Sequence, residues 1–127
     1  MSRISARENL MKLVFGYNFN KENCEIEEFL GEENLTEEDK NYILCGFDGV
    51  KNNAEEITKL IEDNLVNYKL DRICKTDLAI LMVAIYEIKY ANMPKKVVIN
   101  EAVELSKKYS LDNSYKFVNG LLAKVVN

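Results

Sequence analysis

The chain has 127 residues, a formal net charge of −4 and 47% hydrophobic residues, which is enough for one compact domain with a buried core. Its longest uninterrupted apolar run extends from Leu78 to Tyr86, which is far shorter than the roughly 20 residues of a membrane span. Charged residues interrupt the apolar ones at the N-terminus, unlike in a signal peptide, so we expect a cytoplasmic protein without a membrane segment.

The residue types on which most catalytic and metal sites depend are absent or scattered. The chain has no histidine, and its cysteines at positions 24, 45 and 74 are too widely spaced for a disulfide framework or a zinc site. The glycines form no phosphate-binding loop motif, and no pair of carboxylates is embedded in an apolar segment. We therefore expect a protein that is not an enzyme and binds no cofactor or metal.

Helical patterns begin at the N-terminus. Apolar residues at helical spacing predict a first helix over about residues 3–18, with SARE at 5–8 as a capping box. A short helix is expected over residues 25–30. TEED at residues 36–39 opens the next helix.

The helix that begins at TEED carries an apolar stripe as far as about Leu65. Two glycines, Gly46 and Gly49, fall within this stripe. We expect them to bend one long helix.

The second half of the chain predicts further helices and no strands. The segment after about residue 75 is apolar on almost every side, so we expect it to be the central helix. The predicted segments are a short turn at 70–73, a helix from about Thr76 to Tyr90, a helix after Pro94 from Val97 or Val98 to Tyr109, and a last helix over 114–126 capped by Asp112 or Asn113. The fold class is all-α, with about seven helices.

An Asn-Gly pair lies inside the last predicted helix. Gly120 is mid-helix because Phe117, Leu121 and Val125 share one apolar stripe around it. A glycine there costs about 1 kcal/mol relative to alanine, which favours a reason such as close packing of another backbone. Lys116 and Asn119 beside Phe117 give this helix the residues of a ligand surface as well as those of a core.

The charge is divided unevenly along the chain. Residues 19–66 carry four lysines and fourteen acidic residues, whereas residues 89–127 carry seven lysines and three acidic residues. Residues 1–18 are also net positive. A polyanion would be attracted to the two ends, which can adjoin in a helical bundle, and repelled by the middle. The alternative is that each charge run is a solvated helix face.

Several motifs occur in order between Asp71 and Leu122: DR at the start, AIL and AIYE in the central helix, PKKVVINEAVEL after it and SYKFVNG at the end, with ARENLMKLVFGY near the N-terminus. In these motifs the chain resembles the NusB family of transcription antitermination factors. The resemblance implies one all-helical domain with two three-helix subdomains, at about residues 1–66 and 67–127. It also implies a function without catalysis: binding the boxA RNA of nascent ribosomal RNA leaders together with the ribosomal protein NusE, so that RNA polymerase reads through terminators.

The resemblance further implies an RNA surface where the basic first helix lies beside the start of the last helix. Cations there would contact phosphates, an aromatic ring would stack on a base, and an amide would bind a base edge or the backbone. The alternative role for the ring is packing in the core, and the alternative role for the amide is a hydrogen bond to the end of a neighbouring helix. The RNA-binding residues predicted in this way are the cations Arg3, Arg7, Lys12 and Lys116, the ring of Phe117 and the amide of Asn119.

The central helix departs from the family pattern V-D-R-A-I-L-R. Leu78 and Met82 stand where arginines are common, four residues apart on one helix face. They predict a small apolar patch, with Asp77 as an ionic contact, that either binds NusE or supports a homodimer. We expect Tyr86 and Glu87 to be structural, and Glu87 needs a buried partner if it is enclosed.

Two other functions stay open at this point. A NusB-like domain serves as the RNA-recognition part of ribosomal RNA cytosine methyltransferases, but this chain ends at Asn127 without room for a cofactor-binding fold. A helical protein-interaction module without an RNA role suits the overall acidity, and it predicts that reversing Arg7 and Lys116 changes only solubility.

Overall fold

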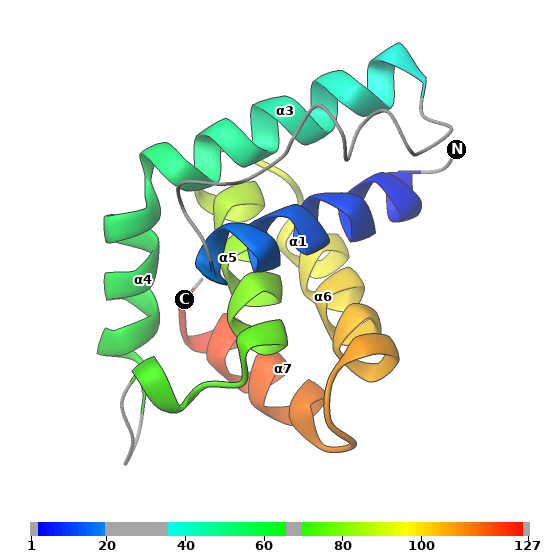
Figure 1. Cartoon of the computed structure of the whole chain (residues 1–127). Helices are drawn as coiled ribbons and strands as arrows, with labels where there is room; N and C mark the ends of the chain where they lie inside the picture. The colour runs from blue at the N-terminus through cyan, green and yellow to red at the C-terminus, as the bar shows by residue number, and fades with distance from the viewer. Residues whose placement is uncertain (1–2, 20–35, 66–69, 126–127) are drawn as a thin grey trace.

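The computed structural model describes residues 3–19, 36–65 and 70–125, and within these ranges the chain is helical without a strand (Figure 1). This confirms the all-α fold class. The predicted helix over residues 25–30 lies outside the described residues. No helix within the described ranges is long and apolar enough to cross a membrane. The helices are α1 (Arg3–Phe19), α3 (Glu37–Asn52), α4 (Ala54–Asp63), α5 (Lys75–Lys89), α6 (Lys95–Tyr109) and α7 (Ser114–Val125), with the predicted short turn present as a 3-10 helix at Leu70–Arg72.

Helix α5 is the centre of the fold, as its sequence predicts. Eleven of its 15 residues are buried, because α1, α3, α4, α6 and α7 all pack against it (Figure 1). Its burial on every side explains why no polar face interrupts the run from Leu78 to Ile85. The surrounding helices contribute one or two apolar stripes each to a shared core, for example Leu10, Phe47, Ile57 and Leu122.

The predicted long helix after TEED is in fact two helices, with the break at Asn53 rather than a bend at the glycines. The Asn53 backbone N–H donates to the Gly49 carbonyl at 3.1 Å and its side-chain Nδ2 donates to the same oxygen at 2.8 Å, which ends α3. Helix α4 then starts in a new direction that turns Ile57 and Ile61 into the core.

The two glycines of α3 permit close packing instead. A Cβ at Gly46 would lie 2.5 Å from Leu10 Cδ2 of α1, and a Cβ at Gly49 would collide with the ring of Tyr86 in α5. Both positions therefore let neighbouring side chains approach the α3 backbone.

Helix starts follow the capping signals in part. Thr36 caps α3 as expected, because its Oγ1 accepts a hydrogen bond from the Asp39 N–H at 3.1 Å. Helix α1 already begins at Arg3, so Ser5 lies inside it rather than capping it. Helix α6 begins directly after Pro94, two or three residues earlier than the sequence suggested. The predicted division into subdomains at about residue 66 falls where the structure is not described, and it stays a prediction.

Candidate nucleic-acid interface

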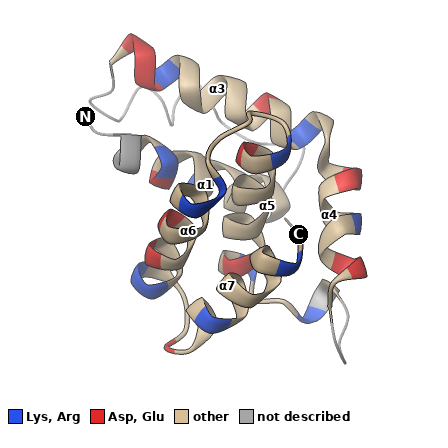
Figure 2. Cartoon of the chain, turned by 180° about the vertical axis from the view of Figure 1, so that it is seen from behind, with Lys and Arg blue, Asp and Glu red and all other residues tan. Residues whose placement is uncertain are grey.

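The outer face of α7 is cationic and shallow. Lys116, Asn119, Gly120 and Lys124 are all exposed there, and Phe117 is half-buried at the edge of the same face. The helix contains two lysines and no acidic residue, whereas α4 beside it carries four acidic residues and one lysine (Figure 2). Three of the predicted RNA-binding residues, Lys116, Phe117 and Asn119, thus lie on or beside one accessible face.

Gly120 has no packing explanation within the described part of the chain. Among the described residues outside the adjoining turns of α7, no atom lies within 4 Å of the place that a Cβ would occupy, so the close packing of another backbone that the sequence suggested is not found there. The glycine nevertheless costs α7 about 1 kcal/mol relative to alanine. Its bare backbone is turned to the surface.

A hollow of about 190 Å³ opens beside this glycine, between α7 and the end of α4. The ring of Phe117 and the stem of Leu121 supply apolar walls, and two lysines supply charge. The full lining is Asn64, Leu65, Lys116, Phe117, Gly120, Leu121 and Lys124. Such a combination of ring, amide and cations suits an unstacked nucleotide.

A second group of cations and aromatic rings lies on α6 and on the residues of α1 and α7 that face its last turns. Lys12 Nζ and Lys108 Nζ lie 5.4 and 5.2 Å from the centroid of the Tyr109 ring. Lys107 Nζ lies 5.0 Å from the centroid of the Tyr115 ring. These distances are within the range of cation–π attraction, so the rings hold the ammonium groups near the surface.

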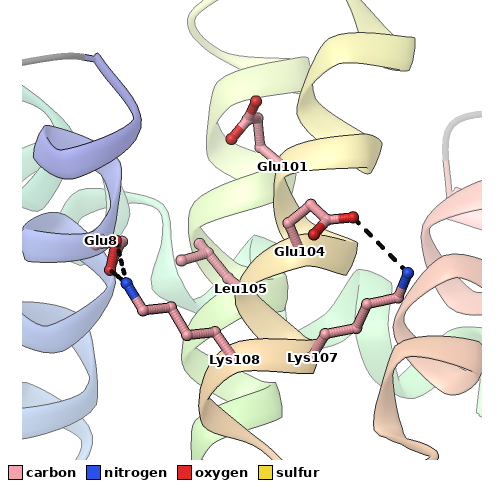
Figure 3. A pocket seen from close by; sticks show the side chains of 6 residues that line it. All are labelled: Glu8, Glu101, Glu104, Leu105, Lys107 and Lys108. Atoms are coloured by element: carbon pink, nitrogen blue, oxygen red, sulfur yellow. Dashed lines mark hydrogen bonds and ion pairs between the residues drawn. The ribbon is translucent and has the colours of Figure 1, made fainter.

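The carboxylate of Glu8 lies in the middle of this second group and partly neutralises it. Lys108 Nζ donates to its two oxygens at 2.8 and 3.1 Å (Figure 3). The Tyr109 hydroxyl donates to Oε1 at 2.6 Å. Burial alone would raise the pKa of Glu8, but these hydrogen bonds and the charges of Lys108 and Lys12 outweigh it and lower that pKa. A hollow of about 370 Å³ adjoins the pair, with Glu101, Glu104 and Lys107 around it (Figure 3).

Arg7 occupies a different place from the one the sequence suggested. Its side chain is buried, at 4% exposure, and its guanidinium donates to both oxygens of the Glu87 carboxylate at 2.7 and 3.1 Å. The expectation of a solvent-facing phosphate contact at Arg7 is therefore wrong, because the charge is already used inside the protein. The structural role expected for Glu87, with a buried partner, is confirmed.

The predicted partner-binding patch is also absent from the surface. Asp77, Leu78 and Met82 are 3%, 8% and 2% exposed, because α5 is covered on every side. Ser106 Oγ lies 3.4 Å from Asp77 Oδ1, and Asn18 Nδ2 lies 3.4 Å from Met82 Sδ, so neighbouring helices satisfy this face. The three residues belong to the interior of the fold and not to an exposed contact.

The two remaining predicted cations of α1 are Lys12 and Arg3. Lys12 is exposed and lies against Tyr109 at the end of α6, while α7 packs chiefly against α4, α5 and α6. The cations of α1 therefore adjoin the end of α6 rather than the Lys116 face. Arg3 belongs to α1, but its side chain is not among the described ones.

Sequence reasoning missed several members of these two surfaces. Lys107, Lys108, Tyr109 and Tyr115 fall within one ten-residue stretch, KKYSLDNSYK, which contains three lysines and two tyrosines. That combination is a signal typical of nucleic-acid binding and was available in the sequence. Lys124 is one helical repeat beyond Gly120 and could have been found from its spacing to Lys116. Among the described residues, no group of histidine, cysteine or acidic side chains could hold a metal ion.

Comparison with known proteins identifies the family. A family model described as the NusB family matches residues 4–127. The transcription antitermination protein NusB of Clostridium novyi is 44% identical over 133 residues, which cover 99% of this chain and 98% of that relative. The structure of T. maritima NusB superposes with a TM-score of 0.90 at 29% identity and covers 98% of this chain and 90% of that one.

A further solved relative is a complex. A crystal structure of the antitermination factors NusB and NusE with double-stranded RNA contains a chain that matches with a TM-score of 0.88 at 25% identity, covering 97% of this chain and 94% of that one. The fold and its relatives define a class of all-helical transcription antitermination factors. This chain belongs to the NusB family. The resemblance seen in the sequence motifs is thereby confirmed.

Proposed function

We propose that the protein is a transcription antitermination factor that binds boxA RNA of nascent ribosomal RNA leader transcripts together with NusE. The family membership supports this function, and a relative of similar fold was solved as a NusB–NusE complex with RNA. Through NusE the protein would join the RNA polymerase complex and act by binding alone, without catalysis.

The observation that carries the proposal is the exposed face of α7. Lys116 and Lys124 stand on it without an acidic neighbour in the same helix, and the hollow beside them exposes part of the Phe117 ring. Single-stranded RNA is bound by this combination, in which cations follow the phosphates and a ring or amide takes a splayed base. A protein-interaction module without an RNA role would not need cations arranged around a ring-lined hollow.

The second cationic surface extends the proposed interface. Lys12 and Lys108 are exposed at the junction of α1 and α6, near the Tyr109 ring, and Lys107 is exposed on the side of α6 that faces α7, near the Tyr115 ring. Glu8 offsets part of this positive charge. We therefore expect the second cationic surface to contribute less to phosphate binding than the α7 face does.

Binding of labelled RNA tests the proposal. We would measure fluorescence anisotropy of a boxA RNA, a scrambled RNA of equal length and a double-stranded RNA, each with and without NusE, at low and high salt. The variant is the charge reversal Lys116→Glu with Lys124→Glu. The matched control is Lys89→Glu, because Lys89 is also exposed but lies in the last turn of α5, at the end far from α7 (Figure 1).

We expect boxA to bind more tightly than the scrambled RNA, NusE to strengthen this binding, and salt and the double variant to weaken it. The control variant should bind like the unchanged protein. Equal, weak binding of boxA and scrambled RNA in the presence of NusE would contradict the RNA role and favour an interaction module. A preference for the double-stranded RNA would contradict the proposal that the α7 hollow binds a base of single-stranded RNA.

A further inference from the structure

We propose that the hollow between α3 and the C-terminal end of α5 binds an arginine side chain that a basic partner protein presents. The hollow lies at the end of α5 far from α7 (Figure 1), so the inference goes beyond the proposed RNA-binding function and does not depend on it. It gives the acidic side of the molecule a binding role of its own.

The hollow has room for one long side chain. Its volume is about 310 Å³, at the lower end of the roughly 300–1,000 Å³ of small-molecule pockets. Helix α3 forms one wall, the last turn of α5 forms another, and the segment that follows α5 contributes the remainder. The lining residues on which the inference depends are Glu38 and Asn41 of α3, Tyr86 and Glu87 of α5, and Ala91 and Met93 after it.

The aromatic wall of the hollow is fixed before any ligand arrives. The absence of a Cβ at Gly49 lets the Tyr86 ring lie directly on α3, and the Tyr86 hydroxyl lies 3.5 Å from the Cys45 carbonyl oxygen. The Tyr90 ring stacks on the Tyr86 ring with the centroids 6.4 Å apart and the planes at 19°. The Tyr90 hydroxyl donates in turn to Glu56 of α4. A ring held in position loses little conformational entropy when a ligand packs on it.

The electrostatics of the hollow favour a cation. Glu38 is an exposed lining residue and Glu87 a buried one, and no lysine or arginine is among the described residues that line it. Arg7 already balances the charge of Glu87. The attraction therefore comes from Glu38 and from the carbonyl end of α5, where the helix dipole is negative. Lys89 in the same turn of α5 is exposed and does not line the hollow.

An arginine side chain suits these walls better than other side chains do. Its aliphatic stem can pack against Met93 and Ala91, while its planar guanidinium lies on the ring of Tyr86. From there the guanidinium can donate to the Glu38 carboxylate and to the side-chain oxygen of Asn41. A lysine ammonium would pair with the carboxylate but would not stack flat on the ring, and an aliphatic side chain would offer the carboxylate no donor.

The surface around the hollow favours a basic protein over RNA as the partner. Described residues 36–65 carry eight acidic residues and three lysines, whereas α7 carries two lysines and no acidic residue. The first surface repels a polyanion and attracts a basic protein surface. Leu44, which is 37% exposed, follows Asn41 by three positions on α3 and can contact an apolar residue beside the arginine.

Peptide binding to the full chain tests the inference. The probe is a short capped peptide with one central arginine between a leucine and a lysine. Its matched forms carry lysine, citrulline or norleucine in place of that arginine, and citrulline keeps the shape of the side chain while it removes the charge. NMR titration of isotope-labelled protein gives the affinity and shows which backbone amides respond.

Two variants of the hollow are compared, each with a matched control. Ala91→Phe fills the hollow, and its control is Ala123→Phe, since Ala123 is also exposed but lies on α7. Glu38→Gln removes the exposed lining charge, and its control is Glu37→Gln, since Glu37 is exposed in the same turn of α3 and does not line the hollow. Circular dichroism checks that the variants fold, and Glu38→Gln decides the test if Ala91→Phe does not.

We expect the arginine peptide to shift the amide signals of the lining residues and to bind about tenfold more tightly than the citrulline peptide, since only arginine brings a charge to the carboxylate. Ala91→Phe should abolish this binding, and Glu38→Gln should weaken it about threefold, as expected for an exposed ion pair. The two control variants should bind the peptide like the unchanged protein. Ala91→Phe should bind boxA with NusE as tightly as the unchanged protein does.

Several results would overturn the inference. Absence of arginine-peptide binding, or equal binding of the norleucine peptide, would mean that the hollow does not select a guanidinium. Equal binding by Ala91→Phe would place the peptide on the acidic surface of α3 and α4 outside the hollow. Loss of boxA binding in Ala91→Phe would assign the hollow to the RNA complex itself. By contrast, a protein that does not prefer boxA would end the proposed function and leave this inference standing.

Discussion

Arg7 of α1 and Glu87 of α5 form a buried two-point ion pair although they are 80 positions apart in the chain. The Arg7 Nε–H donates to Oε1 at 2.7 Å and Nη2 donates to Oε2 at 3.1 Å. The Tyr42 hydroxyl of α3 donates to the same Oε2 at 2.8 Å, and Glu101 of α6 lies 3.8 Å from Nη1. The Arg7–Glu87 ion pair therefore connects side chains from four helices.

Removal of one partner of this pair should destabilise the fold strongly. We expect Arg7→Met to lower the free energy of unfolding by about 3–5 kcal/mol, because Glu87 would remain as a buried charge without its cation. The double variant Arg7→Met with Glu87→Leu should recover much of this loss, since neither buried charge remains. Urea denaturation followed by circular dichroism measures all three. A loss near zero for Arg7→Met would mean that the pair does not hold the helices together.

Stability should fall at acid pH in part through Glu8. The pKa of Glu8 in the folded protein is lower than its ordinary value of 4.5, so ionised Glu8 stabilises the fold above that pH. This contribution is lost as the pH falls through the lowered pKa. We expect Glu8→Gln to unfold at a lower temperature than the unchanged protein at neutral pH, and the difference to vanish in strong acid.

Glu104→Gln is the control for the pH series. Glu104 also pairs with a lysine of α6, but at 3.7 Å and largely in solvent, so its loss should hardly change the unfolding midpoint. Midpoints of the three proteins are compared from neutral pH to strong acid. A Glu8→Gln difference that is the same at every pH would contradict the role of the ionised carboxylate.

Met82 should behave as a core residue. Met82→Ala is expected to cost about 2–5 kcal/mol of unfolding free energy, because it leaves a cavity in the fully covered α5. Val97→Ala is the control, since Val97 is 48% exposed and its truncation should cost far less. The same urea denaturation measures both. A small loss of unfolding free energy for Met82→Ala, together with weaker NusE binding, would contradict the core role and support the exposed patch that the sequence suggested.

The sequence predicted the all-α fold class and the central helix, but it did not predict the break at Asn53 or which charged side chains face solvent. The apolar run of α5 predicted a central helix, yet treating Leu78 and Met82 as one face of that helix required an exposed side that a central helix lacks. Arg7 was taken as a surface cation because its partner Glu87 is too distant in the chain for any local pattern to connect them. The burial of a side chain and its pairing with a residue distant in the chain depend on how the helices pack. The sequence of one helix alone does not predict them.

Local sequence patterns were more reliable for the exposed face of α7. Lys116, Phe117 and Asn119 were grouped from their neighbouring positions in the last helix and from the family motif, and the structure has them on or beside one accessible face of α7. The hollow beside them could not be predicted, because Asn64 and Leu65 line it from the segment directly after α4, far from α7 in the sequence. Glu8 was also missed, since its partners Lys108 and Tyr109 lie about a hundred residues away.

The slope of log affinity against log salt concentration should report how many phosphates α7 contacts. For a single strand, each lysine that neutralises a phosphate contributes about 0.7 to the slope of log affinity against log salt concentration. We therefore expect Lys116→Gln and Lys124→Gln each to lower the magnitude of this slope by about 0.7 in titrations of boxA with NusE present. Lys89→Gln should leave the slope unchanged, because Lys89 lies far from this face. Weaker binding with an unchanged slope in the α7 variants would mean that these lysines act through the shape of the hollow and not by contact with phosphate.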